Sequence, residues 1–480
     1  MTDAIEIFLN ELEKENISYV HWKSNTNIDK ALSGEDDLDI VVDPQKKEHI
    51  FKIFKKLHII RGFSTKDSWQ NEIFHYFGID IQKKKLVHIH LHFLLEVGYD
   101  MDKSVNLPIV EKYINDKIKY KYIYIPTVEN EYIILIIRLL LKNAFIPYIL
   151  LSPLTQLKIY KAQKSKGVVT GNAYNEFLDL YSRVDRIKLN KSLEDVYSFL
   201  KKDFFYQCED VIKNNDSLKD YFSCSGKLKK MLKTYRYHED IKSFFISFYR
   251  VNQIRLSKFN RNKIKFKKLP EYGGKIFAFV GGDGAGKTSN IEKLYEILVE
   301  HFYVEIIHVG RPKVSILGIF FRITAKLFKN FGLKDIAQSF IYLEVANNRK
   351  KAYEKALDIK RKGGIVLLDR IPLEGITAMD CPRVNTLNKQ YTLLLKLEEY
   401  FYKKIDINKV DKLIVLKLNP EIALRRRPED DAEELLIRSG QIWEKDFSNI
   451  DNSHVINTEN TFHYVEEEIL KIVWNSINEV

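Results

Sequence analysis

From residue 275 onward, short apolar runs alternate with longer segments in which apolar residues recur every three or four positions. This pattern predicts strands that alternate with helices, with one glycine-rich loop after the first strand. Such an order is typical of an α/β fold in which helices cover both faces of a parallel sheet. The expected strands are 275–280, 304–309, 365–368, 412–418 and 454–456.

The N-terminal part of the chain also contains strand and helix patterns, but they do not alternate regularly as they do after residue 275. Short strand patterns outnumber helical ones there. This mixture predicts an α+β domain. After residue 125 the pattern becomes mainly helical, and it includes the helical spacing of 132–141 and 175–184. The expected N-terminal elements are a helix over 3–15 and strands over 19–22, 38–42, 76–81 and 86–94.

A chain of 480 residues exceeds what one hydrophobic core usually organises. The Pro- and Gly-containing run 269–274 marks a boundary. We therefore predict an α+β domain over 1–125, a helical connector over 126–270 and an α/β domain over 271–480. Within the connector, 227–268 is rich in Lys and Arg with interleaved Phe and Tyr. It is interpreted as a solvated amphipathic segment, with a surface for membranes or polyanions as the alternative.

Composition limits the partners and the compartment. Lys and Arg outnumber Asp and Glu by 77 to 65, which agrees with an anionic substrate and does not require nucleic acid. The three cysteines form no metal-ligand or disulfide spacing, so a reducing cytoplasm is expected. The most apolar window, 133–151, is interrupted by Arg138, Lys142 and Pro147, and the N-terminus has no secretion signal. Membrane association is therefore not expected.

The first apolar run of the α/β region leads into Gly281-Gly282-Asp283-Gly284-Ala285-Gly286-Lys287-Thr288, which has the spacing GxxxxGK[ST]. In a P-loop, glycines let the backbone aim its N–H groups at phosphate oxygens, at the positive end of a helix. Lys287 is expected to bridge the β- and γ-phosphates, and the Thr288 hydroxyl to bind Mg²⁺. A structural glycine turn is the alternative. The residues expected to bind ATP are Gly281, Asp283, Gly284, Ala285, Gly286, Lys287, Thr288 and Ser289.

The third apolar run ends in Asp369-Arg370, at the sheet edge where open α/β folds bind ligands. Asp369 is expected in the Mg²⁺ shell. Arg370 suits bidentate binding of the transferring phosphate, with a surface salt bridge as the alternative. After the fourth run, 419–431 carries Arg425, Arg426 and Arg427 into an acidic segment. This pattern resembles a lid, and Arg426 and Arg427 are candidates for stabilising the transition state.

Together these motifs resemble the thymidylate kinase family of nucleoside monophosphate kinases. The resemblance rests on the P-loop, Arg311-Pro312, Arg349 within Ala346-Asn347-Asn348-Arg349, the pair Asp369-Arg370 and the run 420–424. It implies an ATP-dependent, Mg²⁺-requiring kinase. Members of the family often dimerise through their helices, so a homodimer is left open. The acceptor contacts that it implies are Asp283, Arg311, Arg349 and Arg370.

Two positions depart from that family. Val280 stands where the family usually has glutamate, and Val345 or a neighbour falls where an aromatic ring stacks on thymine. Loss of the ring argues against dTMP as the acceptor. A sugar, polyol, sugar phosphate or nucleoside monophosphate remains open, as does a place in surface-polysaccharide synthesis. The stretch 316–331 is expected to pack over the acceptor pocket, with membrane contact as the alternative.

The N-terminal segment resembles the opening of a nucleotidyltransferase domain. Asp37 and Asp39 would point to one face of a strand, as metal-binding carboxylates require. His90 stands where a third carboxylate is usual, so a degenerate, substrate-recognising domain is expected. His88, His90 and His92 share one face, which leaves a metal site open against packing on a half-buried sheet.

The leading hypothesis is thus a kinase in which Lys287, Thr288, Asp369 and Arg370 handle nucleotide and metal. Asp283, Arg311 and Arg349 would face a small-molecule acceptor. One alternative is a bifunctional kinase and nucleotidyltransferase. Another is a nucleotide-gated interaction or defence protein that uses ATP as a switch.

Overall fold

The computed structural model describes residues 1–69, 72–142, 144, 156–157, 167–259, 267–310, 312–376, 381–387 and 392–479. The chain divides into two compact units. The first unit comprises 1–80 and 86–266, and the second comprises 81–85 and 267–480. The three-part division at 125/126 and 270/271 stays a prediction.

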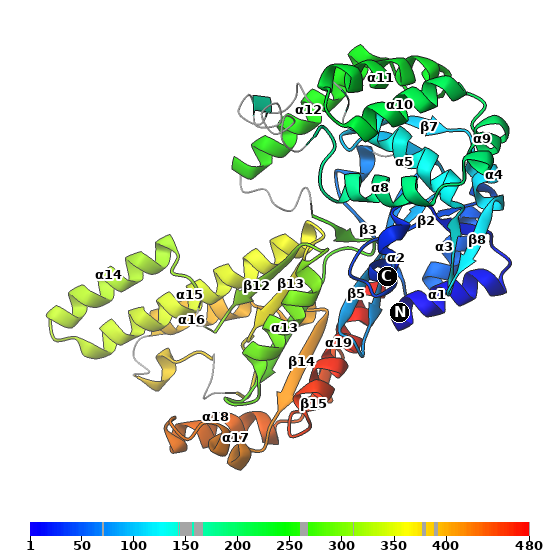
Figure 1. Cartoon of the computed structure of the whole chain (residues 1–480). Helices are drawn as coiled ribbons and strands as arrows, with labels where there is room; N and C mark the ends of the chain where they lie inside the picture. The colour runs from blue at the N-terminus through cyan, green and yellow to red at the C-terminus, as the bar shows by residue number, and fades with distance from the viewer. Residues whose placement is uncertain are drawn as a thin grey trace. The chain divides into compact units, whose positions relative to one another are not determined.

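The second unit is built on a five-stranded parallel sheet (Figure 1). Its strands are β11 (Ile276–Gly281), β12 (Val304–His308), β13 (Ile365–Asp369), β14 (Lys412–Lys417) and β15 (Ser453–Asn457). Each predicted strand of this region is confirmed, and its ends differ by no more than one residue. β11 is buried along its whole length, as expected of a strand covered on both faces.

The strand order β12-β13-β11-β14-β15 determines which helix covers which face. The chain runs from β11 outward to β12 and then back to β13, and right-handed crossovers put the two connections on opposite faces. Accordingly α13 (Lys287–Val299) and α15 (Lys334–Arg361) both pack on β11, β12 and β13. The final helix, α19 (Phe462–Asn478), contacts α13 and the strands β14 and β15.

Helix α14 (Ile316–Asn330) lies against α15, and α16 (Thr392–Lys403) contacts α15 as well. Phe321 of α14 joins Leu343 and Phe401 in a small core shared by the three helices. The opposite side of α14 is apolar and exposed: Ile316 is 90% exposed and Phe320 58%. In the described part of the chain, no helix combines the length and the apolar character that crossing a bilayer requires.

The first unit contains a mixed sheet in the order β1-β2-β5-β4-β3. Its strands are β1 (Tyr19–His21), β2 (Leu38–Val42), β3 (Ile60–Phe63), β4 (Ile73–Asp80) and β5 (Lys85–His92). The helices α1 (Asp3–Lys14) and α3 (Lys47–Lys56) pack on one face through a single apolar cluster. The predicted helix and strands are all present. The sequence missed β3 and two hairpins, β6 (Leu95–Tyr99) with β7 (Asp102–Leu107) and β8 (Lys117–Tyr120) with β9 (Ile123–Pro126).

Helices cover the other face of this sheet and share its core. Val20 and Val41 from the sheet join Tyr132, Phe177 and Phe205 from the helices in one buried cluster. This shared core explains why the predicted connector falls within the first compact unit. These helices are α5 (Val128–Lys142), α8 (Asn172–Arg183), α9 (Arg186–Asp195), α10 (Lys202–Asn214) and α11 (Leu218–Met231). Helix α12 (Asp240–Phe259) contacts β7 instead. Parts of two stretches from the sequence analysis lie outside the described residues. These parts are 143 and 145–151 of the apolar window 133–151, and 260–266 of the basic segment 227–268.

Glu131, on α5, gives the first unit a pH-dependent stability. Its Oε1 accepts a hydrogen bond from the Asn25 backbone N–H at 2.8 Å, and burial raises its pKa to about 7. Because the folded pKa exceeds the unfolded one, this group's contribution is complete below about pH 4.5 and is lost as the pH rises through 7. Glu131→Gln keeps an acceptor and removes the charge. The substitution should therefore raise the free energy of unfolding above pH 7. This gain should be roughly 3 kcal/mol larger than the change that the same substitution causes at pH 4.5.

Urea denaturation of wild type and variant between about pH 4.5 and pH 8 measures this difference. Glu194→Gln, at a side chain 70% exposed, is the matched control and should leave the pH profile unchanged. An unchanged profile for Glu131→Gln would contradict the assignment.

Candidate active site

The glycine-rich loop joins β11 to α13, in the strand–loop–helix context that the motif requires. Gly284 and Gly286 have φ angles of +80° and +79°, which residues with a Cβ adopt at a cost. The Lys287 ammonium is buried and donates to the carbonyls of Gly281 and Gly282, both at 2.8 Å. The Lys287 side chain therefore folds back over the glycine-rich loop. Thr288 and Ser289, in the first turn of α13, are exposed.

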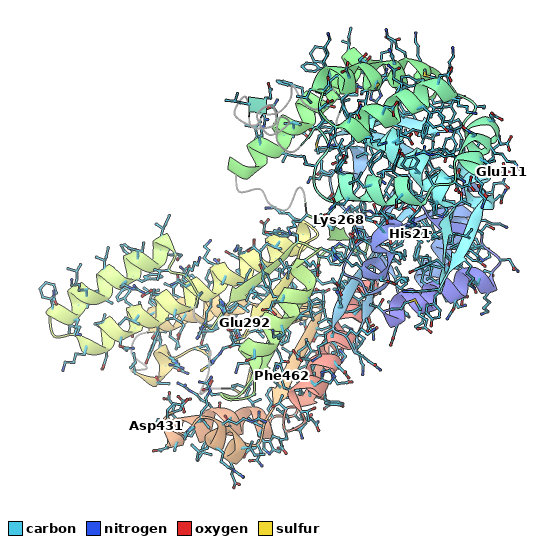
Figure 2. The ribbon with its side chains drawn as sticks, in the orientation of Figure 1. His21, Glu111, Lys268, Glu292, Asp431 and Phe462 are labelled. Atoms are coloured by element: carbon cyan, nitrogen blue, oxygen red, sulfur yellow. The ribbon has the colours of Figure 1, made fainter. Side chains whose placement is uncertain are left out.

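The loop also packs against α18 (Ala432–Glu444). A Cβ on Gly282 would lie 2.7 Å from the Ser439 Oγ, closer than real side chains approach. Glycine at 282 thus permits the contact between the loop and this helix. Asp431, labelled in Figure 2, lies at the start of α18. Its side chain caps the helix by accepting a hydrogen bond from the Glu434 backbone N–H at 2.9 Å.

Asp369 ends β13 and lies beside His308, its partner in the register with β12. The Asp369 Oδ2 is 2.9 Å from the His308 Nδ1. Its Oδ1 is buried and has no hydrogen-bond partner in the described part of the chain. A buried carboxylate oxygen of this kind fits a hard divalent cation such as Mg²⁺, which prefers oxygen ligands. The residues predicted to bind metal here therefore fit the ion chemically.

Asp283 lies between two guanidinium groups. Its Oδ1 accepts from the Arg370 Nη2 at 3.3 Å, and its Oδ2 lies 3.6 Å from the Arg438 Nη1. Arg370 has a φ of +71°, which is uncommon for a residue with a side chain. Arg370 thus forms a salt bridge, and both side chains also line the cavity described below, so its role in phosphate binding stays a prediction.

Arg349 is buried on α15. Its Nη1 donates to the Tyr402 hydroxyl at 2.6 Å, and that hydroxyl donates to the Cys381 carbonyl at 3.0 Å. Its Nη2 also approaches the Gly310 carbonyl at 3.5 Å. Arg349 is thus fixed behind the end of β12 and does not line the cavity. Arg311, predicted to face the acceptor, lies outside the described residues.

The two lid arginines differ in position. Helix α17 (Pro420–Arg426) ends at Arg426, whose guanidinium donates to the carbonyls of Gly284 at 3.4 Å and Thr458 at 3.0 Å. Arg427 instead lines the cavity and lies 3.6 Å from Asp430. Arg426 therefore braces the phosphate loop from outside, whereas Arg427 faces the space above it.

These groups surround one cavity of about 550 Å³. The P-loop forms one wall through Gly284, Gly286, Lys287, Thr288 and Ser289, and Asp369 lies at the sheet edge. Arg370, Arg383, Arg427 and Arg438 supply positive charge on the remaining walls, among the acids Asp283, Asp430, Asp431 and Glu434.

Sequence reasoning missed His308, Arg383 and Arg438. His308 had a usable signal, since it ends a strand at the ligand-binding edge. Arg438 also had one: Asp431, Glu434, Leu435 and Arg438 recur at helical spacing, so one face of α18 lines the cavity. Arg383 had none, because a 3₁₀ turn over Val384–Thr386 follows it and no periodicity marks it.

Asp37 and Asp39 of the first unit both contact histidines. The Asp37 Oδ1 is 2.7 Å from the His88 Nδ1, and the Asp39 Oδ1 is 3.2 Å from the His90 Nδ1. Lys23 lies 2.8 Å from the Asp39 Oδ1. Hydrogen bonding to His88 and the charges of His90 and His88 outweigh burial and lower the pKa of Asp37 to about 2.

The strand order, the phosphate loop at the carboxyl edge of the sheet and an arginine-lined cavity above it define the second unit as a P-loop kinase-like fold. Part of the chain is 31% identical to a thymidylate kinase of Caldicellulosiruptor saccharolyticus over 154 residues, which are 32% of this chain and 69% of the relative. The chain therefore belongs to the thymidylate kinase family.

No protein-family profile matches the chain. A solved thymidylate kinase from Candida albicans is similar over 43% of this chain and 94% of its own, with 18% identity and a TM-score of 0.31. The nucleotidyltransferase-like interpretation of residues 1–125 stays a prediction.

Proposed function

We propose that the second unit transfers the γ-phosphoryl group of ATP to the phosphate of a small acceptor of the nucleoside monophosphate class. One observation carries the proposal: the cavity above the P-loop is also lined by Arg370, Arg383, Arg427 and Arg438. Nucleotide phosphates on the loop and an acceptor phosphate on the arginines would therefore meet in one space. Phosphoryl transfer asks for little beyond such positioning and charge stabilisation.

On the nucleotide side, Lys287 and the loop N–H groups hold the β- and γ-phosphates. The Thr288 hydroxyl and the open Asp369 Oδ1 are the groups that would hold Mg²⁺, which neutralises phosphate charge when bound. His308, at 2.9 Å from the other Asp369 oxygen, orients that carboxylate.

On the acceptor side, Asp283 positions the Arg370 guanidinium, which binds the transferring or accepting phosphate. Arg427 is the lid arginine that reaches the cavity, and Arg426 supports the loop. Arg349 contributes by holding the Gly310 carbonyl just after β12.

The arginines favour a phosphorylated acceptor over a neutral one, because a neutral sugar or polyol would leave the guanidinium groups without a matching anion. The similarity to thymidylate kinases points the same way and gives sugar acceptors or a polysaccharide pathway no support. The base stays open, since Val280 and Val345 depart from the family pattern for thymine.

The test measures acceptor-dependent ADP release by the full chain with Mg-ATP. Nucleoside monophosphates should stimulate release, and the matching nucleosides, sugars and polyols should not. Arg370→Met should lower kcat/KM for the acceptor by about 100-fold. Arg361→Met, at a side chain 75% exposed on α15, is the matched control.

Stimulation by a sugar or polyol would contradict the acceptor class. ATP binding that depends on Lys287, with no stimulation by any acceptor, would instead favour the nucleotide switch. The bifunctional alternative stays a hypothesis with less support, because histidines and Lys23 already engage both Asp37 and Asp39.

A further inference from the structure

Four histidines and two aspartates gather on one face of the sheet in the first unit. β2 and β5 are parallel, and their register sets Asp39 opposite His90. Side chains alternate along a strand, so His92 projects from the same face as His90. No role in the proposed kinase reaction uses these residues.

Within this cluster, two imidazoles converge on one carboxylate oxygen. The Asp39 Oδ1 lies 3.2 Å from the His90 Nδ1 and 3.3 Å from the His92 Nε2. The ligand atoms of the three residues all lie within 4.8 Å of one another. In a tetrahedral site with metal–nitrogen bonds of about 2.0–2.1 Å, neighbouring ligand atoms are about 3.3 Å apart. The two separations from the Asp39 Oδ1 match this value, and the third is no more than 4.8 Å.

We infer that Asp39, His90 and His92 form a binding site for a divalent transition-metal ion of the Zn²⁺ type. Two imidazoles and one carboxylate are the donors that such an ion prefers, whereas Mg²⁺ prefers oxygen ligands alone. Three protein ligands leave one position open for water or a small anion. This ligand set combines one of the two predicted carboxylates with two of the three histidines for which the sequence left a metal site open.

Asp37 and His88 support His90 in this role. If its Nδ1 binds the ion, the proton lies on Nε2, and that atom faces the Asp37 Oδ2 at 3.5 Å. The Asp37 Oδ1 is in turn fixed by the His88 Nδ1 at 2.7 Å. A carboxylate behind a ligating imidazole fixes its tautomer and raises its basicity.

A second histidine group, His75 with His88 and His90, is less suited. It has no carboxylate, and the His75 Nδ1 and His88 Nε2 already lie 3.0 Å apart. Lys23, at 2.8 Å from the Asp39 Oδ1, competes with an ion at the first group. Removing this lysine should therefore strengthen metal binding there, which a purely structural cluster would not do.

The experiment titrates Zn²⁺ into the full chain after chelator treatment, against a chromophoric competitor, and records the visible spectrum of the Co²⁺ form. Wild type should take up one ion per chain with a tetrahedral Co²⁺ spectrum. Asp39→Asn and His92→Gln should weaken binding at least 10-fold, and Lys23→Gln should tighten it. His75→Gln and the exposed control His49→Gln should bind like wild type. Circular dichroism checks that each variant is folded.

No uptake by wild type would overturn the inference, as would equal binding by wild type and His92→Gln. Loss of binding in His75→Gln with retention in His92→Gln would also overturn it, since the ion would then lie at the second group.

Discussion

Lys287→Met is expected to lower kcat/KM about 1000-fold. The ammonium is the buried positive charge at the phosphate loop, and it lies 2.8 Å from both the Gly281 and Gly282 carbonyls. Methionine keeps most of the side-chain length and removes the positive charge. That charge interacts most strongly with the phosphoryl group in the transition state. Steady-state ADP release with Mg-ATP and the stimulating acceptor measures the loss.

Lys293→Met is the matched control. It lies on the same helix, α13, at a side chain 54% exposed that pairs with Glu296 at 2.8 Å. This variant should retain wild-type kinetics. A Lys287→Met enzyme that kept more than about a tenth of the wild-type kcat/KM would show that the loop does not act on the transferring phosphate.

Gly274→Ala is expected to destabilise the second unit by about 3 kcal/mol. A Cβ at this position would lie 2.6 Å from the Gly364 carbonyl oxygen and 2.8 Å from the Lys360 Cα. Both are backbone atoms, so no side chain can turn away, and the start of β11 must separate from the end of α15. Thermal unfolding should show the transition at lower temperature.

ATP identifies which transition belongs to the second unit, because a ligand raises the midpoint of the unit that binds it. The matched control is Gly440→Ala in α18, where an added Cβ meets nothing within 4 Å. Alanine should stabilise that helix by about 0.5–1 kcal/mol. Equal midpoints for Gly274→Ala and wild type would mean that the backbone at 274 is looser than described.

The strands of the second unit were predicted well from the sequence, because a strand buried on both faces consists almost entirely of consecutive apolar residues. Ile276–Gly281 and Ile365–Asp369 are such runs, and their chemistry follows immediately in the chain. The phosphate loop is likewise a local feature, so its spacing alone identified it.

Two short strands carried no comparable signal. The sequence of β8, Lys117–Tyr120, is half charged and mostly exposed, and the short β3 contains Arg61 and Gly62. The helical connector was also judged by periodicity alone. Periodicity shows which face of a helix is buried, but it does not show which other element that face packs against. The core that Tyr132 and Phe177 share with Val20 was therefore not foreseen.

Within the site, residues contributed by distant segments escaped prediction. Arg438 meets Asp283 only because α18 packs on Gly282, and His308 meets Asp369 only through the β12–β13 register. In the first unit, the converging contacts on Asp39 depend on the parallel register of β2 with β5. The positions of His308 and Arg438 had a signal, but the residue with which each one pairs leaves no trace in the spacing of one sequence.

The left-handed backbone at Arg370 has an evolutionary consequence. A side-chain-bearing residue at φ +71° costs roughly 1–2 kcal/mol relative to a right-handed conformation, and glycine would avoid most of that cost. Selection for heat resistance alone would therefore favour glycine at 370 and discard the guanidinium that pairs with Asp283. The arginine at 370 therefore serves function at a cost in stability. A variant designed for higher stability should keep it.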